Sequence, residues 1–528
     1  MSYEIVVVGA GLGGLTAGAL LAARGLKVCV VERESSAGGC AASFEKFGYT
    51  FEPAAGLYSG WGEGQTHARL FAQLPVAPPR ARRLSPAYIV RLGDRTEIRV
   101  GTDHYEEFAD DLRAAFPECA ALAVDLYSEL RLLADADEAA HARTSNRSVS
   151  PRTLLGWKIG GRGKGSQGDE RSRGNEQTHN DRERIVAART ETVASRLIAA
   201  SPRLRSFIDA QLQLFASCAS DECSLLNAAH ALALPHRGLY ALAGGPQAHA
   251  DALTESIKMS GGTVRFDTTA LRLAYDAAGE VVGVDLLSGE TVRASRAVVS
   301  NLTVWDTYGK LIGASRTPAD VRARLKALRG WGAYLVLFSM DESAASRLPS
   351  ERMILLNDDD GDEGPTRPTT DATRSTLDAT RSMFALNVGP ATDARGPEGT
   401  RAATLAAFAD TAEWFAYHED ESEHEAQDER ALAFWWERLH AALPEIADGA
   451  EVIETLTPRT YYEQTRRRLG AVWGLARTLE TSVADPLTHR THLPKLYMVG
   501  DTVASANGIE AVTRNALAVA DEIVPSRS

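Results

Sequence analysis

The sequence predicts an α/β protein in which a Rossmann-type dinucleotide-binding domain is interrupted by an inserted α+β domain. Three observations predict this fold. Spaced glycines follow an apolar run at the start of the chain, a second apolar run precedes Gly500-Asp501 near its end, and strand-like runs are scattered between them. At 528 residues the chain is also too long for a single hydrophobic core.

The first element is a buried parallel strand followed by a phosphate-binding turn. Ile5 to Val8 is apolar and β-branched, and Gly9, Gly11 and Gly14 follow in G-x-G-x-x-G spacing. In this pattern the first glycine permits a tight turn, the second lets a pyrophosphate approach the backbone, and the third lets the helix pack against the strand. Leu15 to Arg24 supplies the helix, whose N-terminus favours phosphate.

The second strand, Lys27 to Val31, ends in an acid. Glu32 lies about 20 residues past the glycines, where a carboxylate binds ribose hydroxyls and repels a 2′-phosphate. An adenine dinucleotide other than NADP is therefore expected. The alternative is a glycine turn with no nucleotide in an ordinary α/β domain.

Composition restricts the class of protein. The net charge of −13 and pI near 5.5 argue against bulk binding of nucleic acid. No apolar run reaches the length of a membrane helix, and Glu4 in the first strand argues against a secretory signal. The odd number of cysteines, without a C-x-x-C pair, favours reduced thiols and no metal site (Cys29, Cys40, Cys119, Cys218 and Cys223). We expect a cytoplasmic protein, with peripheral membrane contact as an open alternative.

Two segments have the composition of disordered loops. Arg143 to Arg184 is rich in Gly, Arg and polar residues, and Asn357 to Arg381 is acidic and rich in Thr. A solvated insertion is favoured for the first segment over a site for anionic lipid.

The remaining pattern predicts further strands and helices. Leu239 to Gly262 predicts a glycine turn and then a helix, and Ala403 to Leu443 is expected to be mostly helical. The expected strands are Val264 to Phe266, Ala270 to Ala274, a hairpin from Val281 to Ala294, Ala297 to Ser300, Ala333 to Ser339, Ser382 to Val388 and Leu496 to Val499. A last helix is predicted from about Ile509 to Ile523.

Two features favour a resident FAD over an exchanging nicotinamide cofactor. The Gly38-Gly39 doublet lets the chain fold back over the pyrophosphate, and Asp501 is placed to bind ribityl or ribose hydroxyls. The helix after Asp501 would point its positive end at the flavin. No second G-x-G-x-x-G follows a strand, so no separate NAD(P)H domain is expected.

The sequence resembles the phytoene desaturase, carotenoid isomerase and retinol saturase group of flavoproteins, most closely the isomerase and saturase branch. The segments that carry this resemblance are GGCAASFEKFGYTFEPAAGLYSGWGEG (38–64), SPRLRSFIDAQLQLFAS (201–217), GLYALAGGPQAHADALTESIKMSGGTVRF (238–266), TPRTYYEQTRRRLGAVWGL (457–475) and LYMVGDTVASANGIEAV (496–512).

The resemblance implies a glutathione-reductase-like FAD-binding domain of the GG-doublet type with an inserted α+β substrate domain. By that division 1–80, 232–305 and 465–528 form the FAD-binding domain, and 81–231 and 306–464 form the substrate domain. It also implies an apolar tunnel for a long polyene. The residues expected to contact FAD are Gly9, Ala10, Gly11, Leu12, Gly13, Gly14, Glu32, Arg33, Gly39, Gly500, Asp501 and Ile509. Arg33 has an alternative interpretation as a surface charge.

The chain departs from the group's pattern at positions expected to lie near the isoalloxazine ring. Glu52 stands where the group often has Asp, and Ala54 where it has Gly. Ser505-Ala506 replaces a Pro-Gly pair, and Asn515-Ala516 replaces Ser-Gly. These side chains would shift the flavin or narrow the tunnel. The polar loop after Trp157 also replaces an apolar region that meets the membrane in the group.

The expected chemistry is hydride exchange between flavin N5 and an apolar polyene or isoprenoid-like small molecule, in desaturation, saturation or cis–trans isomerisation. No catalytic side chain is assigned, because His104, His230 and His236 have ordinary structural interpretations at turns or domain edges. The alternatives are an enzyme similar to flavin amine oxidases or protoporphyrinogen oxidase, for which Trp473 could form an aromatic wall, and a non-catalytic flavoprotein scaffold. The sequence indicates no oligomeric state.

Overall fold

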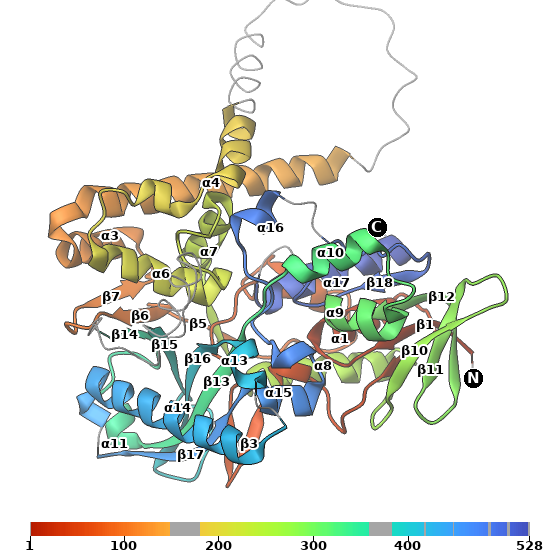
Figure 1. Ribbon diagram of the computed structural model, residues 1–528. Helices are drawn as coiled ribbons and strands as arrows, with labels where there is room; N and C mark the ends of the chain where they lie inside the picture. Colours follow the sequence, from red (N-terminus) through yellow and green to blue (C-terminus); the bar gives the residue numbers. More distant parts are fainter. Residues whose placement is uncertain are drawn as a thin grey trace, which may run out of the picture.

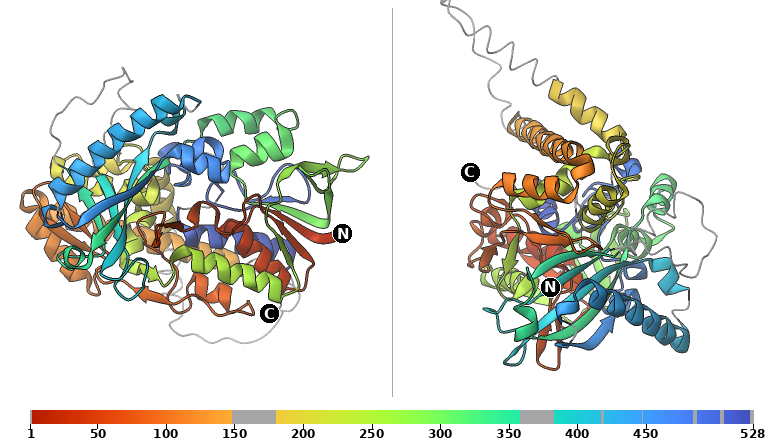
Figure 2. Two further views of the ribbon diagram at one scale, coloured as in Figure 1. Left: turned by 90° about the horizontal axis from the view of Figure 1, so that it is seen from below. Right: turned by 90° about the vertical axis from the view of Figure 1, so that its left-hand side faces the viewer.

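The computed structural model describes residues 2–147, 180–357, 383–416, 419–446, 448–483, 487–503 and 507–525. Within these residues, two seven-stranded sheets organise the chain, and two small two-stranded sheets accompany them. Both chain ends lie beside the first of these sheets (Figures 1 and 2).

The first sheet, which we call the amino-terminal sheet, has the strand order β10-β11-β12-β1-β2-β9, and β18 also pairs with β12. Its strands are β1 (Ser2–Val8), β2 (Val28–Val31), β9 (Thr263–Arg265), β10 (Ala270–Tyr275), β11 (Val281–Leu286), β12 (Thr291–Ser300) and β18 (Leu496–Met498). β12, β1, β2, β9 and β18 run parallel, whereas β10 and β11 form an antiparallel extension.

Helices cover both faces of the amino-terminal sheet. On one face α1 (Leu12–Ala23), α8 (Gly245–Met259) and α17 (Ile509–Ile523) share an apolar core with the strands. Eleven of the twelve residues of α1 are buried, so the helix is apolar all round and lies between its two neighbours. On the other face lie α9 (Val304–Asp306), η4 (Thr307–Gly313) and α10 (Ala319–Ala327).

The second sheet, which we call the central sheet, has the order β17-β13-β16-β15-β14-β6-β7 and is antiparallel except between β14 and β6. Its strands are β6 (Tyr88–Arg91), β7 (Glu97–Val100), β13 (Gly332–Asp341), β14 (Arg352–Leu356), β15 (Met383–Val388), β16 (Thr400–Ala409) and β17 (Ala450–Leu456). One face packs against α14 (Glu421–Ala442). The other face packs against α3 (Tyr105–Ala115), α4 (Ala120–Arg147), α6 (Pro202–Ala216) and α7 (Leu225–Arg237) (Figure 1).

Shorter elements connect these layers: η1 (Gly39–Ala41), β3 (Phe44–Lys46), β4 (Tyr49–Phe51), α2 (Thr66–Phe71), β5 (Ala81–Arg83), η2 (Pro117–Cys119), η3 (Val193–Arg196), β8 (Tyr240–Leu242), α11 (Glu342–Ala345), α13 (Thr411–Phe415), η5 (Pro444–Ile446), α15 (Pro458–Thr465), η6 (Arg468–Gly470) and α16 (Leu479–Val483).

The structure corrects two expectations about strands. Most of the segment 403–443 is helical, as expected, in α13 and α14, but its first residues belong to strand β16, which pairs with β13 and β15. Its alanines and leucines favour a helix locally, but burial on both faces of the sheet overrides that propensity. The expected strand at 297–300 is not separate from the hairpin, since β12 runs through both.

The two expected loops fall largely outside the described residues. α4 continues to Arg147 and residues 180–190 are helical, so the predicted loop at Arg143–Arg184 is wrong at both margins. Its interior, 148–179, lies outside the described residues, as does 358–381 of the second predicted loop. His230 and His236 lie within α7 and not at a turn.

Candidate functional site

The carboxyl ends of four parallel strands meet at one edge of the amino-terminal sheet. Val8 of β1 is in register with Val31 of β2 and with Ser300 of β12, and Ser300 is in register with Met498 of β18. The residues that follow these ends are therefore neighbours. This edge is where open α/β sheets bind their ligands.

The turn after β1 has the geometry of an anion-binding loop. Gly9 has φ +96°, and a Cβ on Gly14 would clash with the carbonyl oxygen of Gly9. Gly11 is the N-cap of α1 and no side chain caps that end. With Leu12 and Gly13 buried in its first turn, the helix presents backbone N–H groups and its positive dipole end at this edge.

Asn301, which the sequence reasoning missed, holds the two ends of the chain together at this edge. A Cβ on Gly11 would lie 2.5 Å from Asn301 Nδ2, one on Gly13 would lie 2.6 Å from Asn301 Oδ1, and one on Gly500 would lie 3.2 Å from the same oxygen. The amide therefore packs on both glycine segments and explains why they carry no side chains. The available signal was an amide directly after the predicted strand 297–300.

Glu32 is fixed beside the glycine loop by backbone donors. The Ala10 N–H donates to Glu32 Oε2 at 2.6 Å, and the Glu34 N–H donates to Glu32 Oε1 at 2.9 Å. These bonds orient the carboxylate and leave lone pairs for a further donor. The position and chemistry fit a ribose diol.

The glycine doublet folds onto the same loop. The Gly38 N–H donates to Ala10 O at 2.9 Å, and Gly39, at φ +59°, would place a Cβ 3.3 Å from the Cα of Gly11. Only residues without side chains permit this approach of the two backbones.

The carboxyl-terminal segment completes the edge. Gly500 has φ +120°, and its backbone N would lie 3.1 Å from a Cβ on Gly13. Asp501 Oδ2 accepts a hydrogen bond from Arg467 Nη2 at 2.6 Å. Ile509 begins α17, whose N-cap, Gly508, provides no side-chain cap. Residues 504–506, which include Ser505 and Ala506, lie outside the described residues.

Arg33 points to a different part of the molecule. Its guanidinium donates to the carbonyls of Glu463 and Gln464 at the end of α15 and pairs with Glu34. The structure thus brings the predicted glycines, Ala10, Leu12, Glu32, Asp501 and Ile509 to one region and turns the Arg33 side chain towards α15. That these residues contact FAD stays a prediction.

A buried charge cluster fixes the segment that contains Glu52 and Ala54. Glu52 pairs with Arg395, and its Oε2 accepts from Tyr58 Oη at 2.8 Å and from Asn387 Nδ2 at 3.3 Å. Asn387 also donates to Ala54 O at 3.0 Å. We call Glu52, Tyr58, Arg352, Asn387 and Arg395 the Glu52 cluster.

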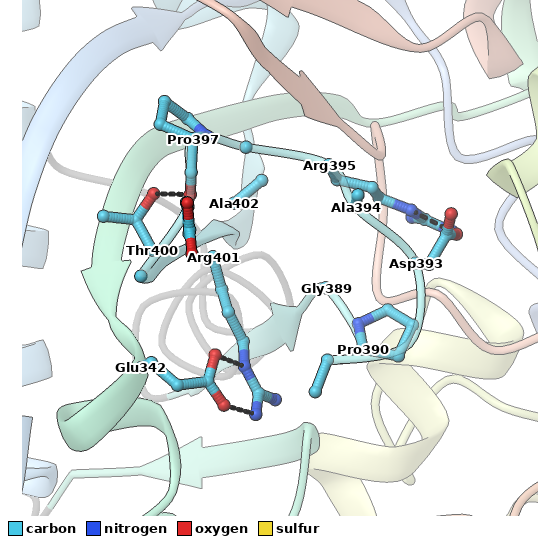
Figure 3. A pocket seen from close by; sticks show the side chains of 14 residues that line it. Glu342, Gly389, Pro390, Asp393, Ala394, Arg395, Pro397, Thr400, Arg401 and Ala402 are labelled. Carbon is cyan, nitrogen blue, oxygen red and sulfur yellow. Dashed lines mark hydrogen bonds and ion pairs between the residues drawn. The ribbon is translucent and has the colours of Figure 1, made fainter.

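The Glu52 cluster is linked to a surface pocket on the central sheet. Arg395 pairs with Asp393 in the loop that lines a pocket of about 170 Å³, where Arg401 and Glu342 form a second pair (Figure 3). Arg352, which lies on β14, donates a hydrogen bond from Nε to Gly56 O at 3.2 Å. Burial, reinforced by Glu52, raises the pKa of Tyr58. Three side chains from the central sheet and its loop therefore hold residues 52–56 in place.

An apolar layer extends from this segment. Ala55 and Leu57 pack into the core shared by the central sheet and helices α3, α4, α6 and α7. The same core includes Trp331 and Phe408, and Phe408 stacks on Trp473 with ring centroids 4.5 Å apart.

Two absences among the described residues bear on other functions. They contain no group of three or more His, Cys, Asp or Glu side chains arranged to hold a metal ion. None of their helices combines the length and the apolarity that crossing a bilayer requires.

Comparisons with known proteins agree with this geometry. Residues 7–74 match the family model described as an NAD(P)-binding Rossmann-like domain. The chain is 22% identical to prolycopene isomerase of Arabidopsis thaliana, over 97% of this chain and 80% of that protein. It is 25% identical to prolycopene isomerase 2 of an Oncidium hybrid over 60% of this chain, and 26% identical to all-trans-retinol 13,14-reductase of Rattus norvegicus over 63% of it. The last two matches span about half of those relatives, 51% and 53%.

Solved structures share the fold across the whole chain. An oxidoreductase from Methanosarcina mazei superposes with a TM-score of 0.61 at 16% identity, covering 98% of this chain and 99% of that one. Wild-type putrescine oxidase bound to putrescine also gives 0.61, at 14% identity and full coverage of both chains (100%). The predicted α/β class with a Rossmann-type domain is confirmed.

Proposed function

We propose that the substrate of this protein is an apolar polyene or isoprenoid. The reason is that the chain is a homologue of prolycopene isomerases and retinol 13,14-reductases. These enzymes belong to the phytoene desaturase, carotenoid isomerase and retinol saturase family of FAD-dependent oxidoreductases. The reaction we propose is desaturation, saturation or cis–trans isomerisation of a carbon–carbon double bond. The relatives act, by their names, on prolycopene and on all-trans-retinol.

The cofactor is FAD, and the residues at the edge of the amino-terminal sheet fit it. The uncapped start of α1 suits the pyrophosphate, and the oriented Glu32 carboxylate suits a ribose. Bound FAD supplies hydride exchange, which a hydrocarbon chain without acidic or basic groups requires. The side chains of the protein then position the substrate and exclude water from it.

The observation that carries the proposal is the continuity of the apolar layer with the Glu52–Gly56 segment. Ala55 is 7% exposed and packs in one core with Trp331 and Phe408. A chain of conjugated carbons placed along such a layer gains the free energy of apolar burial, about 25 cal/mol per Å². Leu57 and Trp473, which are only partly buried against this core, are the side chains best placed to contact it.

The direct test is an anaerobic substrate panel with two readouts. Purified holoenzyme is mixed with all-trans-retinol, prolycopene, phytoene and putrescine, while flavin absorbance and product composition by chromatography are followed. Oxidised and pre-reduced enzyme are both used, since desaturation starts from the first form and saturation from the second. Conversion of a polyene supports the proposal, and turnover of putrescine alone contradicts it.

A pair of variants separates substrate binding from folding. Leu57→Asp places a charge against the apolar layer and should lower kcat/KM for the polyene at least tenfold with FAD retained. Leu271→Asp introduces the same charge at a side chain that is 51% exposed and should leave kcat/KM unchanged. Equal kinetics of the two variants would place the substrate elsewhere.

A second candidate function is oxidation of an amine. The Phe408–Trp473 stack, with planes inclined by 21°, provides an aromatic face of the kind that attracts a cation. The non-catalytic scaffold is the remaining alternative. It predicts that no substrate of the panel changes the flavin spectrum, although dithionite reduces the bound flavin.

A further inference from the structure

The ion pair of Arg467 and Asp501 lies at the carboxyl-terminal segment that we expect to hold FAD. Arg467 Nη2 donates to Asp501 Oδ2 at 2.6 Å, and Arg467 Nε donates to Ala471 O at 2.6 Å. Asp501 directly follows Gly500, whose backbone meets the glycine loop. The side chains of Arg467 and Asp501 are 13% and 19% exposed, so water screens the pair weakly.

The same ion pair acts on Cys40, which follows the glycine doublet. Burial raises the pKa of the Cys40 thiol, while Arg467 lowers it and Asp501 raises it. Burial alone would lower the pKa of Arg467, but Asp501 and Cys40 outweigh it and raise that pKa above its ordinary value. Both charges are therefore close to the doublet as well as to the Gly500 turn.

A tight turn directs the side chain of Arg467 towards Asp501, whereas the side chains of Arg466 and Arg468 point away from Asp501. Arg466 and Leu469 have φ of +52° and +50°, and a Cβ on Gly470 would clash with the carbonyl oxygen of Pro458. Arg466 and Arg468 are exposed, and their guanidinium groups lie over the rings of Tyr462 and Trp305. Of three consecutive arginines, only Arg467 faces Asp501.

We infer that Arg467 is a positioning residue that acts through Asp501 to raise the reduction potential of bound FAD. Two electrons and one proton convert oxidised flavin into its reduced anion, so a nearby carboxylate opposes reduction. Arg467 neutralises Asp501 and removes that opposition, while it holds the carboxylate in place for a cofactor hydroxyl. The inference depends on FAD binding and not on the identity of the substrate.

The test is the midpoint potential of the bound flavin, measured by dye-coupled reduction of holoenzyme without substrate. Arg467→Gln should lower the ratio of reduced to oxidised flavin at a given potential at least tenfold, a shift of about −30 mV for a two-electron couple. Arg466→Gln removes the same charge one residue earlier and should leave the potential unchanged. Equal potentials of Arg467→Gln and wild type, or equal shifts in both variants, would overturn the inference.

The double variant distinguishes charge from structural damage. Asp501→Asn should raise the potential by a comparable amount, and Arg467→Gln/Asp501→Asn should return it towards the wild-type value. A potential that falls further in the double variant contradicts an action through Asp501. Should Arg467→Gln lose FAD, Asp501→Asn decides alone, since an unchanged or lower potential in that variant refutes the inference. A substrate panel without turnover would leave these potentials unaffected, so the two proposals fail separately.

Discussion

At the edge of the amino-terminal sheet, glycines and backbone groups shape the site, whereas beside the central sheet charged side chains do so. Gly11, Gly13 and Gly500 surround the Asn301 amide, and Glu32 accepts its two hydrogen bonds from backbone N–H groups. In the Glu52 cluster, by contrast, guanidinium and amide groups of the central sheet and its loop hold residues 52–56. We therefore expect added side-chain atoms to disturb the first region and the loss of a charge to disturb the second.

The largest effect is expected from removing a charge in the Glu52 cluster. Arg395→Met leaves Glu52, which is 3% exposed, without its cationic partner and should lower the free energy of unfolding by about 3–5 kcal/mol. Arg82→Met breaks an ion pair whose arginine side chain is 56% exposed, and it serves as the control with little effect. Chemical denaturation of both variants measures the difference. Equal stabilities would mean that the cluster contributes nothing.

An added methyl group in the glycine edge is expected to have the next largest effect. Gly14→Ala should lower the free energy of unfolding by about 3 kcal/mol and abolish FAD retention, because its Cβ would overlap the Gly9 carbonyl oxygen. Gly309→Ala is the matched control, since nothing lies within 4 Å of a Cβ at that position. Thermal unfolding and the flavin absorbance of purified protein report the two outcomes. Retention of FAD by Gly14→Ala contradicts the close approach of the two backbones.

The amino-terminal region also contains buried polar rings that carry no charge, and these make its stability depend on pH. Burial lowers the pKa of His67 from 6.5 to about 3 and that of His249 well below 6.5. His67 stacks on Trp61 and meets His249 edge-on at 5.1 Å, with Arg514 as a nearby cation. The unfolded chain therefore binds protons that the folded chain rejects between pH 6.5 and about 3, so stability falls as the pH falls through that window.

For His67 alone, the expected loss of unfolding free energy between pH 7.5 and pH 5 is about 2 kcal/mol. His67→Phe keeps an aromatic ring and should reduce the pH dependence of stability by that amount. The measurement is denaturant unfolding of both proteins at the two pH values. Because both proteins contain the same carboxylates, the contribution of these groups cancels in the difference between the two pH profiles. Parallel pH profiles would show that the pKa of His67 is the same in the folded and the unfolded protein.

The smallest effect on stability is expected at the ribose site. Glu32→Ala should weaken FAD binding by about 1–3 kcal/mol, the cost of an unmet hydroxyl partner, and change apo-protein stability less. Glu34 lies two residues after Glu32 and donates its backbone N–H to that carboxylate, so Glu34→Ala keeps this bond and should bind FAD as the wild type does. Fluorescence titration of apo-protein gives both constants. An unchanged constant for Glu32→Ala would mean that another group holds the ribose.

The same difference between the glycine edge and the Glu52 cluster determines what the sequence could predict. The glycine loop, Glu32 and the glycine doublet act through backbone geometry within the first 39 residues, so their spacing reveals them. The Glu52 cluster joins residues 52, 352, 387 and 395, and no local pattern relates these positions. Asn301 was missed for the same reason, since it contacts glycines from both ends of the chain. Arg467 was missed although Asp501 is only 34 residues away, because no local pattern relates the two positions. Strand β16 was mistaken for helix because its burial comes from neighbours distant in sequence.

The order of strands in the amino-terminal sheet has a consequence for biosynthesis. β1 ends at Val8, but its partner β12 begins only at Thr291, and β18 follows at Leu496. At 5–20 residues per second, roughly 15–60 s separate the synthesis of β1 from that of β12. During this interval the nascent unit β1-α1-β2 carries an unpaired apolar edge, which favours aggregation or capture by a chaperone. Insertion of FAD is therefore expected only after Gly500 and Asp501 have been synthesised and reach the glycine loop.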